Sequence, residues 1–264
     1  MAASVFGAMA QDSNTVTLKG DNGNISAIYY KPIGFVEGQK CPIVIFFHGL
    51  GGSKDDANLR QVATGLQQKG VATFLFDFAG CGASEGIMKK QTPKSMFKDA
   101  KVVVDYVKEL PFVKDIALCG YSYGGNVAIQ VAADYGKGTI KAMALMAPLV
   151  SIREDIIHGT LLGHKVERNI ELDETHVISK DFLEDVAEIN IFKLAASYKG
   201  ETYVVQGKED KIVPYTYGEY LEVFMPKAKY EQFKGIDHNF SSDDAEKHAK
   251  AIGEVVNFLV KEVK

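Results

Sequence analysis

Residues 116–124 read IALCGYSYG, an apolar run that leads into a G-x-S-x-G motif. The run predicts a strand over 116–119, and the pattern after it predicts a helix over 123–135. A serine between such a strand and helix lies on a tight, strained turn that lifts its hydroxyl above the sheet edge. A Cβ on the glycine two residues before or after it would clash there. Ser122 is therefore the candidate nucleophile, although a helix-capping serine in a glycine-rich turn has the same sequence.

Short apolar runs alternate with longer amphipathic stretches along most of the chain. The expected strands are residues 15–19, 25–31, 42–47, 71–76, 116–119, 140–146, 201–206 and 229–233. The expected helices are 57–68, 93–110, 123–135, 216–224 and a last one that is capped within 241–244 and ends near 260. Apolar strands separated by helices indicate an α/β fold with a mostly parallel central sheet that helices cover on both faces. An Asn-Gly turn joins the first two strands, so we expect an antiparallel hairpin at one edge.

One long segment interrupts this alternation. Residues 149–197 are rich in charged residues and helix formers and contain no predicted strand. Since a structureless loop of about 50 residues is uncommon in a compact domain, we expect a small helical insertion, or cap, at the carboxyl edge of the sheet. The chain is thus divided into an α/β core, 1–148 and 198–264, and a cap, 149–197.

The charge and the apolar stretches of the sequence argue against a nucleic-acid partner and a membrane partner. The 264 residues contain 30 Lys and Arg against 34 Asp and Glu, a net charge of −4, with no basic run. A nucleic-acid surface is therefore not expected. The longest apolar stretches, 43–47 and 142–150, fall far short of the ~20 residues of a membrane span, so no membrane partner is expected either. We expect a small-molecule substrate, and a homodimer stays open.

The cysteines and the first residues bear on the compartment. Cys41, Cys81 and Cys119 are widely spaced, odd in number and without a CxxC pair, which predicts free thiols in a reducing cytoplasm rather than disulfides or a zinc site. Residues 1–10 end in a small-x-small pattern but have no basic segment, so we interpret them as a loose leader. A secreted protein whose signal peptide has been removed is the alternative.

A serine nucleophile needs a base. Five histidines follow the serine in the chain: His158, His164, His176, His238 and His248. His238 lies in a loop between the last expected strand and the last helix, which opens at the sheet edge where Ser122 lies. His248 has charged neighbours within that helix and is expected at the solvent-exposed surface. The other three lie in the insertion at spacings of six and twelve, which fit no metal-binding helix face, so neither a metal nor a cofactor is expected.

The base in turn needs an orienting acid, which should follow a strand and lie between Ser122 and His238 in the chain. Glu209 and Asp210 both lie in the loop after the expected strand 201–206. Spacing alone does not separate these two carboxylates.

A glycine-rich turn, HGLGG at residues 48–52, follows the expected strand 42–47. Backbone amides of such a turn can point at a developing oxyanion, and the amide of Leu50 would pair with that of Tyr123. A phosphate-binding loop is discounted because no GxxxxGK[ST] is present. The segment DFAGCGAS at 77–84 precedes the serine and is interpreted as a tight structural turn, in which Asp77 bonds local backbone amides.

Together, and in this order, these motifs resemble those of the α/β-hydrolase family over residues 25–262. The matching motifs are HG-x-GG, D-x-x-G-x-G-x-S, G-x-S-x-G, G-x-x-D-x-x-V-P and D-H-x-F. The resemblance implies a catalytic triad of Ser122, Asp210 and His238. Asp210 is preferred to Glu209 because it occupies the aspartate position of the fourth motif.

Within the family, the sequence is most similar to bacterial cinnamoyl (feruloyl) esterases. It shares with them its length, an insertion after an Ala-Pro pair at 147–148 and a D-H-x-F-S ending at 237–241. In such enzymes the insertion covers an aromatic acyl pocket and one of its aspartates can bond the phenolic hydroxyl, a position that Asp155 matches here. Phe182 stands where a pocket tyrosine is expected, since the insertion contains no tyrosine, and Gly49 is expected to line the same pocket.

The resemblance implies a serine carboxylic-ester hydrolase that acts on hydroxycinnamate (feruloyl or p-coumaroyl) esters through an acyl-enzyme. Two alternatives stay open. The same triad would serve a monoacylglycerol or short-chain acyl lipase, or a serine peptidase. The fold would also suit a ligand-binding protein with negligible turnover, although a complete triad with an oxyanion turn argues against it.

Overall fold

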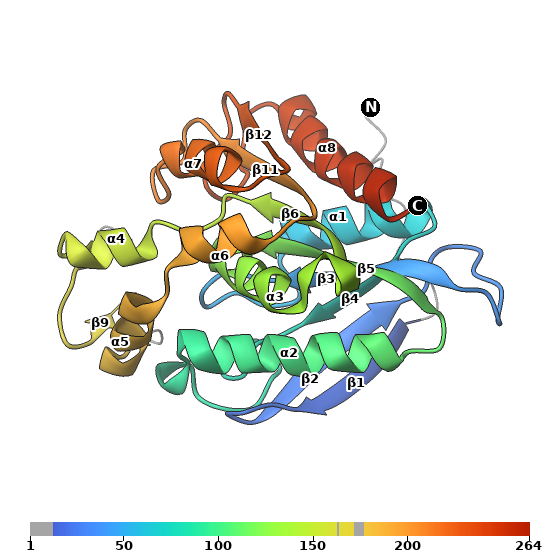
Figure 1. Cartoon of the computed structure of the whole chain (residues 1–264), viewed down its shortest axis with the longest axis horizontal. Coiled ribbons are helices and arrows are strands. Elements are labelled where there is room, and N and C mark those ends of the chain that lie inside the picture. Colours follow the sequence, from blue (N-terminus) through green and yellow to red (C-terminus); the bar gives the residue numbers. More distant parts are fainter. Residues whose placement is uncertain (1–12, 163, 172–176) are drawn as a thin grey trace.

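An eight-stranded sheet forms the middle of the molecule in the computed structural model, which describes residues 13–162, 164–171 and 177–264 (Figure 1). The leader expected at residues 1–10 lies outside this part of the chain. The strand order is β1-β2-β4-β3-β5-β6-β11-β12. Their bounds are β1 Ser13–Lys19, β2 Asn24–Tyr30, β3 Cys41–Phe47, β4 Ala72–Phe76, β5 Val113–Tyr121, β6 Ile140–Met146, β11 Glu201–Gly207 and β12 Ala228–Phe233.

The sheet is mostly parallel, as the sequence predicts. β1 pairs with β2 and β2 with β4 in antiparallel fashion, and every other neighbouring pair is parallel. The antiparallel hairpin therefore lies at one edge. Because β3, β5, β6 and β11 run in the same direction, their carboxyl ends and the loops that follow them share one edge of the sheet.

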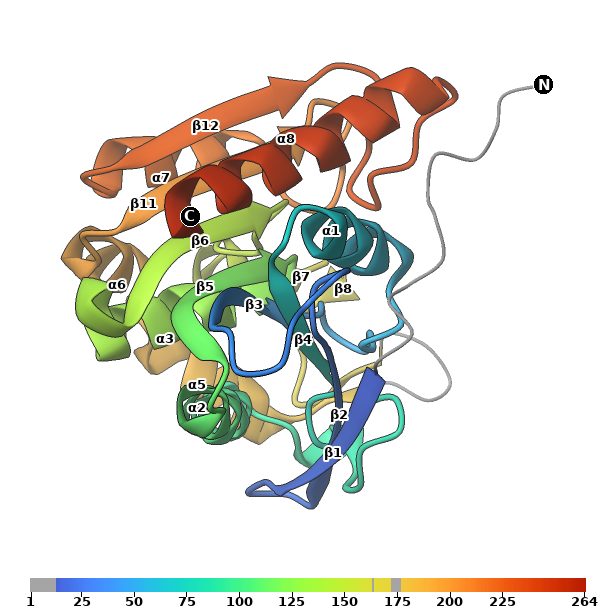
Figure 2. The ribbon, with the colours of Figure 1, turned by 90° about the vertical axis from the view of Figure 1, so that its right-hand side faces the viewer.

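Helices bury both faces of the sheet at its centre, which explains why central strands such as β3 and β4 are apolar throughout. In β3, Ile43 and Ile45 pack into the core beneath α2 (Pro93–Glu109) and α3 (Tyr123–Thr139). The alternate residues, Val44 and Phe46, pack into the second core beneath α1 (Ala57–Gln68) and α8 (Ala245–Val263). The two helix pairs lie on opposite sides of the sheet in Figure 2. α7 (Thr216–Phe224) completes the first layer, and a short 3₁₀ helix, η1, spans Met88–Lys90.

Capping side chains and a glycine mark the ends of the helices, and the cap of α8 lies within 241–244 as predicted. The Asp56 carboxylate caps α1, and Gly70, with a φ of 75°, follows its end. The Asp244 carboxylate caps α8. α3 extends beyond the predicted end, but Gly136 has non-helical dihedrals, so the regular helix stops where the sequence places its end.

The insertion differs from the expected helical segment, because it also contains short strands. Its elements are α4 Ile152–Ile157, β7 Thr160–Leu161, β8 His164–Lys165, β9 Ile170–Glu171, β10 Val177–Ile178, α5 Lys180–Glu188 and α6 Ile191–Ser197. β7 pairs with β8 and β9 with β10, both antiparallel. Strands of two residues are too short to produce an alternating pattern, so the prediction of no strand was wrong.

The cysteines Cys41, Cys81 and Cys119 are buried, and their thiols are free. Burial raises the pKa of the Cys41 and Cys81 thiols, which keeps them protonated and unreactive. Among the described helices, none is both long and apolar enough to cross a membrane.

Candidate active site

Ser122 occupies a strained turn between β5 and α3. Its φ of 53° and ψ of −123° lie in a region that residues other than glycine rarely adopt. Backbone bonds hold the turn from both sides: the Ser122 amide donates to the Met146 carbonyl oxygen over 2.9 Å, and its own carbonyl accepts from the Leu149 amide over 2.9 Å. The serine is thus fixed between the ends of two neighbouring strands.

The glycines around the serine are required by close approach. A Cβ on Gly124 would collide with the carbonyl oxygen of Phe47, and one on Gly120 would collide with the backbone of Gly124. The predicted reason for the G-x-S-x-G spacing is therefore confirmed. A Cβ on Gly49 would lie 3.1 Å from the Ser122 Cβ, so this glycine brings the 48–52 turn against the serine.

Three side chains from separate loops form a continuous hydrogen-bonded series. His238 Nε2 lies 3.0 Å from Ser122 Oγ, and its Nδ1 lies 2.8 Å from Asp210 Oδ2. Glu209 instead accepts a hydrogen bond from the Gly235 amide over 2.7 Å and is exposed. The structure thus separates the two carboxylates that spacing could not, and places Asp210 against the imidazole.

The Asp210 carboxylate is itself held by three donors. Its Oδ1 accepts from the backbone amides of Ile212 over 2.9 Å and Val213 over 2.8 Å. Its Oδ2 accepts from Gln206 Nε2 over 3.1 Å as well as bonding His238. Each of these contacts brings a donor to a carboxylate oxygen, and together they fix which oxygen faces the imidazole. The His238 Nδ1 must then carry the proton, which leaves Nε2 as the acceptor for the serine hydroxyl.

The loop that carries His238 is fastened by two further side chains. The Tyr121 hydroxyl lies 3.2 Å from the His238 carbonyl oxygen, and burial raises the pKa of this phenol, so it remains a donor. His248 Nδ1 lies 2.7 Å from the Phe240 carbonyl oxygen, and its Nε2 lies 2.9 Å from Gln61 Oε1. The prediction that His248 is solvent-exposed was therefore wrong. α8 begins at Ala245, so this histidine lies in its first turn and is half-buried against α1.

The turn at residues 48–52 is stabilised by a buried histidine. His48 Nε2 accepts from the Phe78 amide over 3.0 Å, so its Nδ1 carries the proton and donates to the Gly49 carbonyl oxygen over 2.8 Å. Burial lowers the pKa of His48, which keeps the ring neutral. The Gly52 amide donates to the same carbonyl over 3.1 Å and closes the turn around Leu50. The Tyr123 amide opens α3, where no carbonyl of the preceding helical turn exists to accept from it.

The 77–84 segment is structural, as predicted. Asp77 accepts from the backbone amides of Lys54 over 2.6 Å and Ala83 over 2.8 Å. The Lys54 ammonium also pairs with this fully buried carboxylate. The segment therefore braces the neighbouring 48–52 turn rather than presenting a second nucleophile.

A cavity of about 320 Å³ opens at Ser122 and His238. Its apolar wall consists of Leu50, Leu149, Leu162 and Ile212, and its other residues are Gly49, Gly51, Gly52, Asp56, Tyr121 and Asn239. Gly49, expected from the resemblance to line the acyl pocket, lies at this cavity. Leu149 and Leu162 come from the segment 149–197, so this segment contributes to the cavity wall at Ser122.

Asp155 and Phe182 do not line this cavity. Asp155 accepts from the Ser151 hydroxyl over 2.8 Å, and burial raises its pKa. Phe182 is 2% exposed and packs on the Tyr123 ring, with the ring centroids 5.5 Å apart. The position in the sequence did not reveal that Asp155 bonds within α4, or that Phe182 packs against α3.

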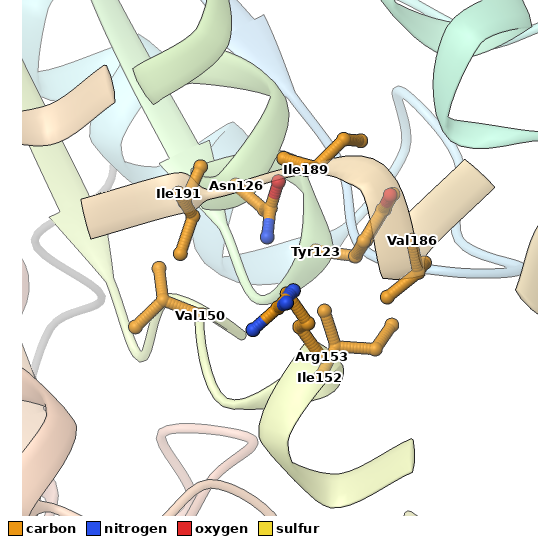
Figure 3. Close-up of a pocket in the computed structure, with 8 residues that line it drawn as sticks. All are labelled: Tyr123, Asn126, Val150, Ile152, Arg153, Val186, Ile189 and Ile191. Carbon is orange, nitrogen blue, oxygen red and sulfur yellow. The ribbon is translucent and has the colours of Figure 1, made fainter. Parts of the chain in front are cut away.

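A second, much smaller pocket lies between α3 and the insertion (Figure 3). It has room for about one water molecule, a volume of about 10 Å³. Its lining residues are Tyr123, Asn126, Val150, Ile152, Arg153, Val186, Ile189 and Ile191. An acyl group does not fit here, so the larger cavity is the candidate substrate site.

Metal ligation receives no support from the described side chains. Within residues 13–162, 164–171 and 177–264, no group of three or more His, Cys, Asp and Glu side chains is placed to hold a metal ion. His158 Nδ1 instead lies 2.7 Å from the Glu154 carbonyl oxygen. His176 lies outside the described residues.

Comparison with known proteins defines the family. The family model described as "Serine aminopeptidase, S33" matches residues 38–172, just over half of the chain. The chain therefore belongs to this family of the α/β-hydrolase superfamily, and its fold is the α/β-hydrolase fold.

Solved structures share the fold of this chain, and curated relatives match parts of its sequence. The chain resembles Est1E from Butyrivibrio proteoclasticus, solved with ferulic acid bound, with a TM-score of 0.87 and 24% identity over 94% of this chain and 99% of that one. It is 34% identical over 119 residues to the polyketide transferase grgF of Penicillium sp, which is 44% of this chain and 40% of that protein. It is 25% identical over 232 residues to the uncharacterized protein YfhR of Salmonella typhimurium, 87% of this chain and 75% of that protein. The first three curated relatives are matched over only 3%, 40% and 30% of their own length.

Proposed function

We propose that this protein is a serine esterase that hydrolyses carboxylic esters through an acyl-enzyme on Ser122. The observation that carries the proposal is the unbroken series from Asp210 to His238 to Ser122, with contacts of 2.8 and 3.0 Å. Its three members come from three loops, and a capping serine would need neither partner. The cavity at the serine supplies the space for a substrate.

The chemistry follows from the direction of each hydrogen bond. His238 Nε2 takes the Ser122 proton while Oγ forms a bond to the ester carbonyl carbon. The amides of Leu50 and Tyr123 hold the negative oxygen of the tetrahedral intermediate. His238 then gives its proton to the alcohol oxygen as the carbon–oxygen bond breaks. Water repeats the sequence on the acyl-enzyme, and Asp210 stabilises the imidazolium in both halves.

We infer that the acyl group is a hydroxycinnamate. The support is the resemblance to Est1E with its bound ferulic acid over nearly the whole chain, and an apolar wall of Leu149, Leu162 and Ile212 that suits a planar ring. Asp155 would reach a phenolic hydroxyl only if the insertion moved, because it lies outside the cavity. The insertion at 149–197 would then act as the cap over the acyl group.

A lipase acting on monoacylglycerols or short acyl chains is the second candidate. It is favoured by the same apolar wall, which offers no side-chain hydrogen bond to a phenol. A serine peptidase on this triad is favoured only by the description of the family. A ligand-binding protein would not need an imidazole bonded at both nitrogens.

A hydrolysis panel separates these candidates. It compares wild type with Ser122→Ala on methyl ferulate, methyl p-coumarate, p-nitrophenyl acetate, p-nitrophenyl decanoate, a monoacylglycerol and an aminoacyl amide. We expect the two hydroxycinnamates to be cleaved fastest and the variant to be inactive on all. Preference for decanoate or monoacylglycerol would replace the hydroxycinnamate assignment, and turnover in Ser122→Ala equal to wild type would refute the esterase itself.

A further inference from the structure

The cavity at Ser122 has two chemically different walls. Leu149, Leu162 and Ile212 form an apolar wall, while Asp56 and Asn239 present polar side chains. The mechanism above uses neither polar side chain. Their place in the cavity therefore calls for a role of their own.

Of the two carboxylate oxygens of Asp56, one accepts hydrogen bonds from backbone amides and the other accepts none from a described residue. Its Oδ1 caps α1 by accepting from the amides of Asn58 and Leu59, each over 3.0 Å. Its Oδ2 has no hydrogen-bond or ion-pair partner in the described part of the chain. A cavity group that can accept a hydrogen bond from a ligand is thus available beside the reacting centre.

Asn239 offers the complementary donor. Its Oδ1 shares the single Tyr121 hydroxyl proton with the His238 carbonyl oxygen, each acceptor lying 3.2 Å from the hydroxyl, and Nδ2 lies on the other side of the amide. Its backbone carbonyl accepts from Asn58 Nδ2 over 2.9 Å, so the start of α1 is tied to the loop that carries His238. Asp56 and Asn239 consequently border the cavity on the same side, next to the imidazole.

The position of the imidazole identifies which part of an ester lies there. His238 donates a proton to the oxygen of the departing alcohol, so the alcohol must lie beside its ring. The acyl group extends away from this ring, along the apolar wall. Asp56 and Asn239 therefore face the alcohol and not the acid.

We propose that Asp56 and Asn239 form a subsite that selects esters whose alcohol carries further hydroxyl groups, such as a glycerol or sugar ester. A hydroxyl is both a donor and an acceptor, so it meets the free carboxylate oxygen and the amide nitrogen at once. An ethyl or methyl alcohol would leave both groups without a ligand partner. The subsite would not select an aminoacyl substrate, because the ammonium of such a substrate lies on its acyl part, away from Asp56. This inference rests on the proposed esterase function and concerns the same site.

The test uses Asp56→Asn, because asparagine caps a helix as well as aspartate does but carries no charge. The assay compares a glycerol monoester with the ethyl ester of the same acid: feruloylglycerol with ethyl ferulate, or monobutyrin with ethyl butyrate if the panel favours aliphatic acids. We expect kcat/KM for the glycerol ester relative to the ethyl ester to fall about tenfold, mainly through KM, as for the loss of one charge-assisted hydrogen bond. General effects of the lost charge on His238 act on both esters and cancel in the ratio.

Two controls keep the outcome clear. Asp55→Asn removes the same charge from the neighbouring exposed residue, which does not line the cavity, and should leave the ratio within twofold of wild type. Asp56→Ser keeps a capping oxygen and should reproduce the loss if the Asn variant folds poorly. An unchanged ratio in both Asp56 variants overturns the subsite, as does an equal fall in Asp55→Asn. If wild type cleaves neither ester, or Ser122→Ala cleaves both, the esterase proposal itself fails and the subsite with it.

Discussion

Substituting Asp210 by asparagine tests how the carboxylate controls the imidazole. Asp210 Oδ1 accepts from two backbone amides, those of Ile212 and Val213. In Asp210→Asn the amide oxygen must keep that place, because an NH₂ group there would face two donors. The new NH₂ then stands where Oδ2 was, 2.8 Å from His238 Nδ1. It can only donate, so it favours the imidazole tautomer with the proton on Nε2.

That tautomer cannot accept the Ser122 proton. We therefore expect kcat to fall about 10⁴-fold at neutral pH, as expected when the orienting acid of such a triad becomes an amide. The new NH₂ also faces the Gln206 donor, which lies 3.1 Å from Oδ2, so the free energy of unfolding should drop by about 1–3 kcal/mol. The assay measures kcat on the best ester of the panel, and urea unfolding checks the fold.

Glu209→Gln is the matched control, because it makes the same chemical change at the adjacent residue. The Glu209 carboxylate accepts from the Gly235 amide, and the amide oxygen of a glutamine side chain can accept the same hydrogen bond. The kcat of this variant should stay within twofold of wild type. A folded Asp210→Asn protein with kcat within tenfold of wild type would refute the tautomer argument, and equal losses in both variants would place the effect in the loop rather than in the acid.

Three further predictions concern the surroundings of the site. Gly124→Ala puts a methyl group against the Phe47 carbonyl, so we expect a loss of several kcal/mol in urea unfolding, or no folded protein; wild-type stability would contradict this. His248→Ala frees the Phe240 carbonyl, and should cost about 1 kcal/mol of stability and less than tenfold in kcat. Burial raises the pKa of Asp155, which therefore contributes stability that is lost as the pH rises. Asp155→Asn should raise Tm at pH 7 but not near pH 3, and the opposite pH trend would refute the burial argument.

The fold was predictable because each central strand is buried on both faces. Residues such as Val44 and Ile45 point into different cores, so the strand has no polar side and is visible as an unbroken apolar run. Helix ends can be predicted because capping is local: Asp56 and Gly70 each act within one turn of their own position in the sequence. The two-residue strands of the insertion have no such local signature.

The hydrogen-bonded series of Ser122, His238 and Asp210 was predictable from chain order and the sheet edge, but the cavity wall was not. Asp210 and Glu209 are adjacent in the sequence. Two backbone amides donate to Asp210 Oδ1, and these hydrogen bonds hold the Asp210 carboxylate, rather than that of Glu209, against His238. Phe182 packs on Tyr123 of α3 because of the path that the insertion takes over this helix, and no local pattern reveals that path. Asp56 had a visible signal as the residue before a helix, but its place in the cavity depends on the contact between Asn58 and Asn239.

The central claim is that Ser122 is a nucleophile activated by His238. Mass spectrometry of the intact protein after reaction with diisopropyl fluorophosphate tests it most directly, since only an activated serine attacks the phosphorus and expels fluoride. We predict one added diisopropylphosphoryl group on the Ser122 peptide in wild type, none in Ser122→Ala, and labelling slowed by orders of magnitude in His238→Ala. A group attached elsewhere, or labelling of His238→Ala at the wild-type rate, would contradict the account.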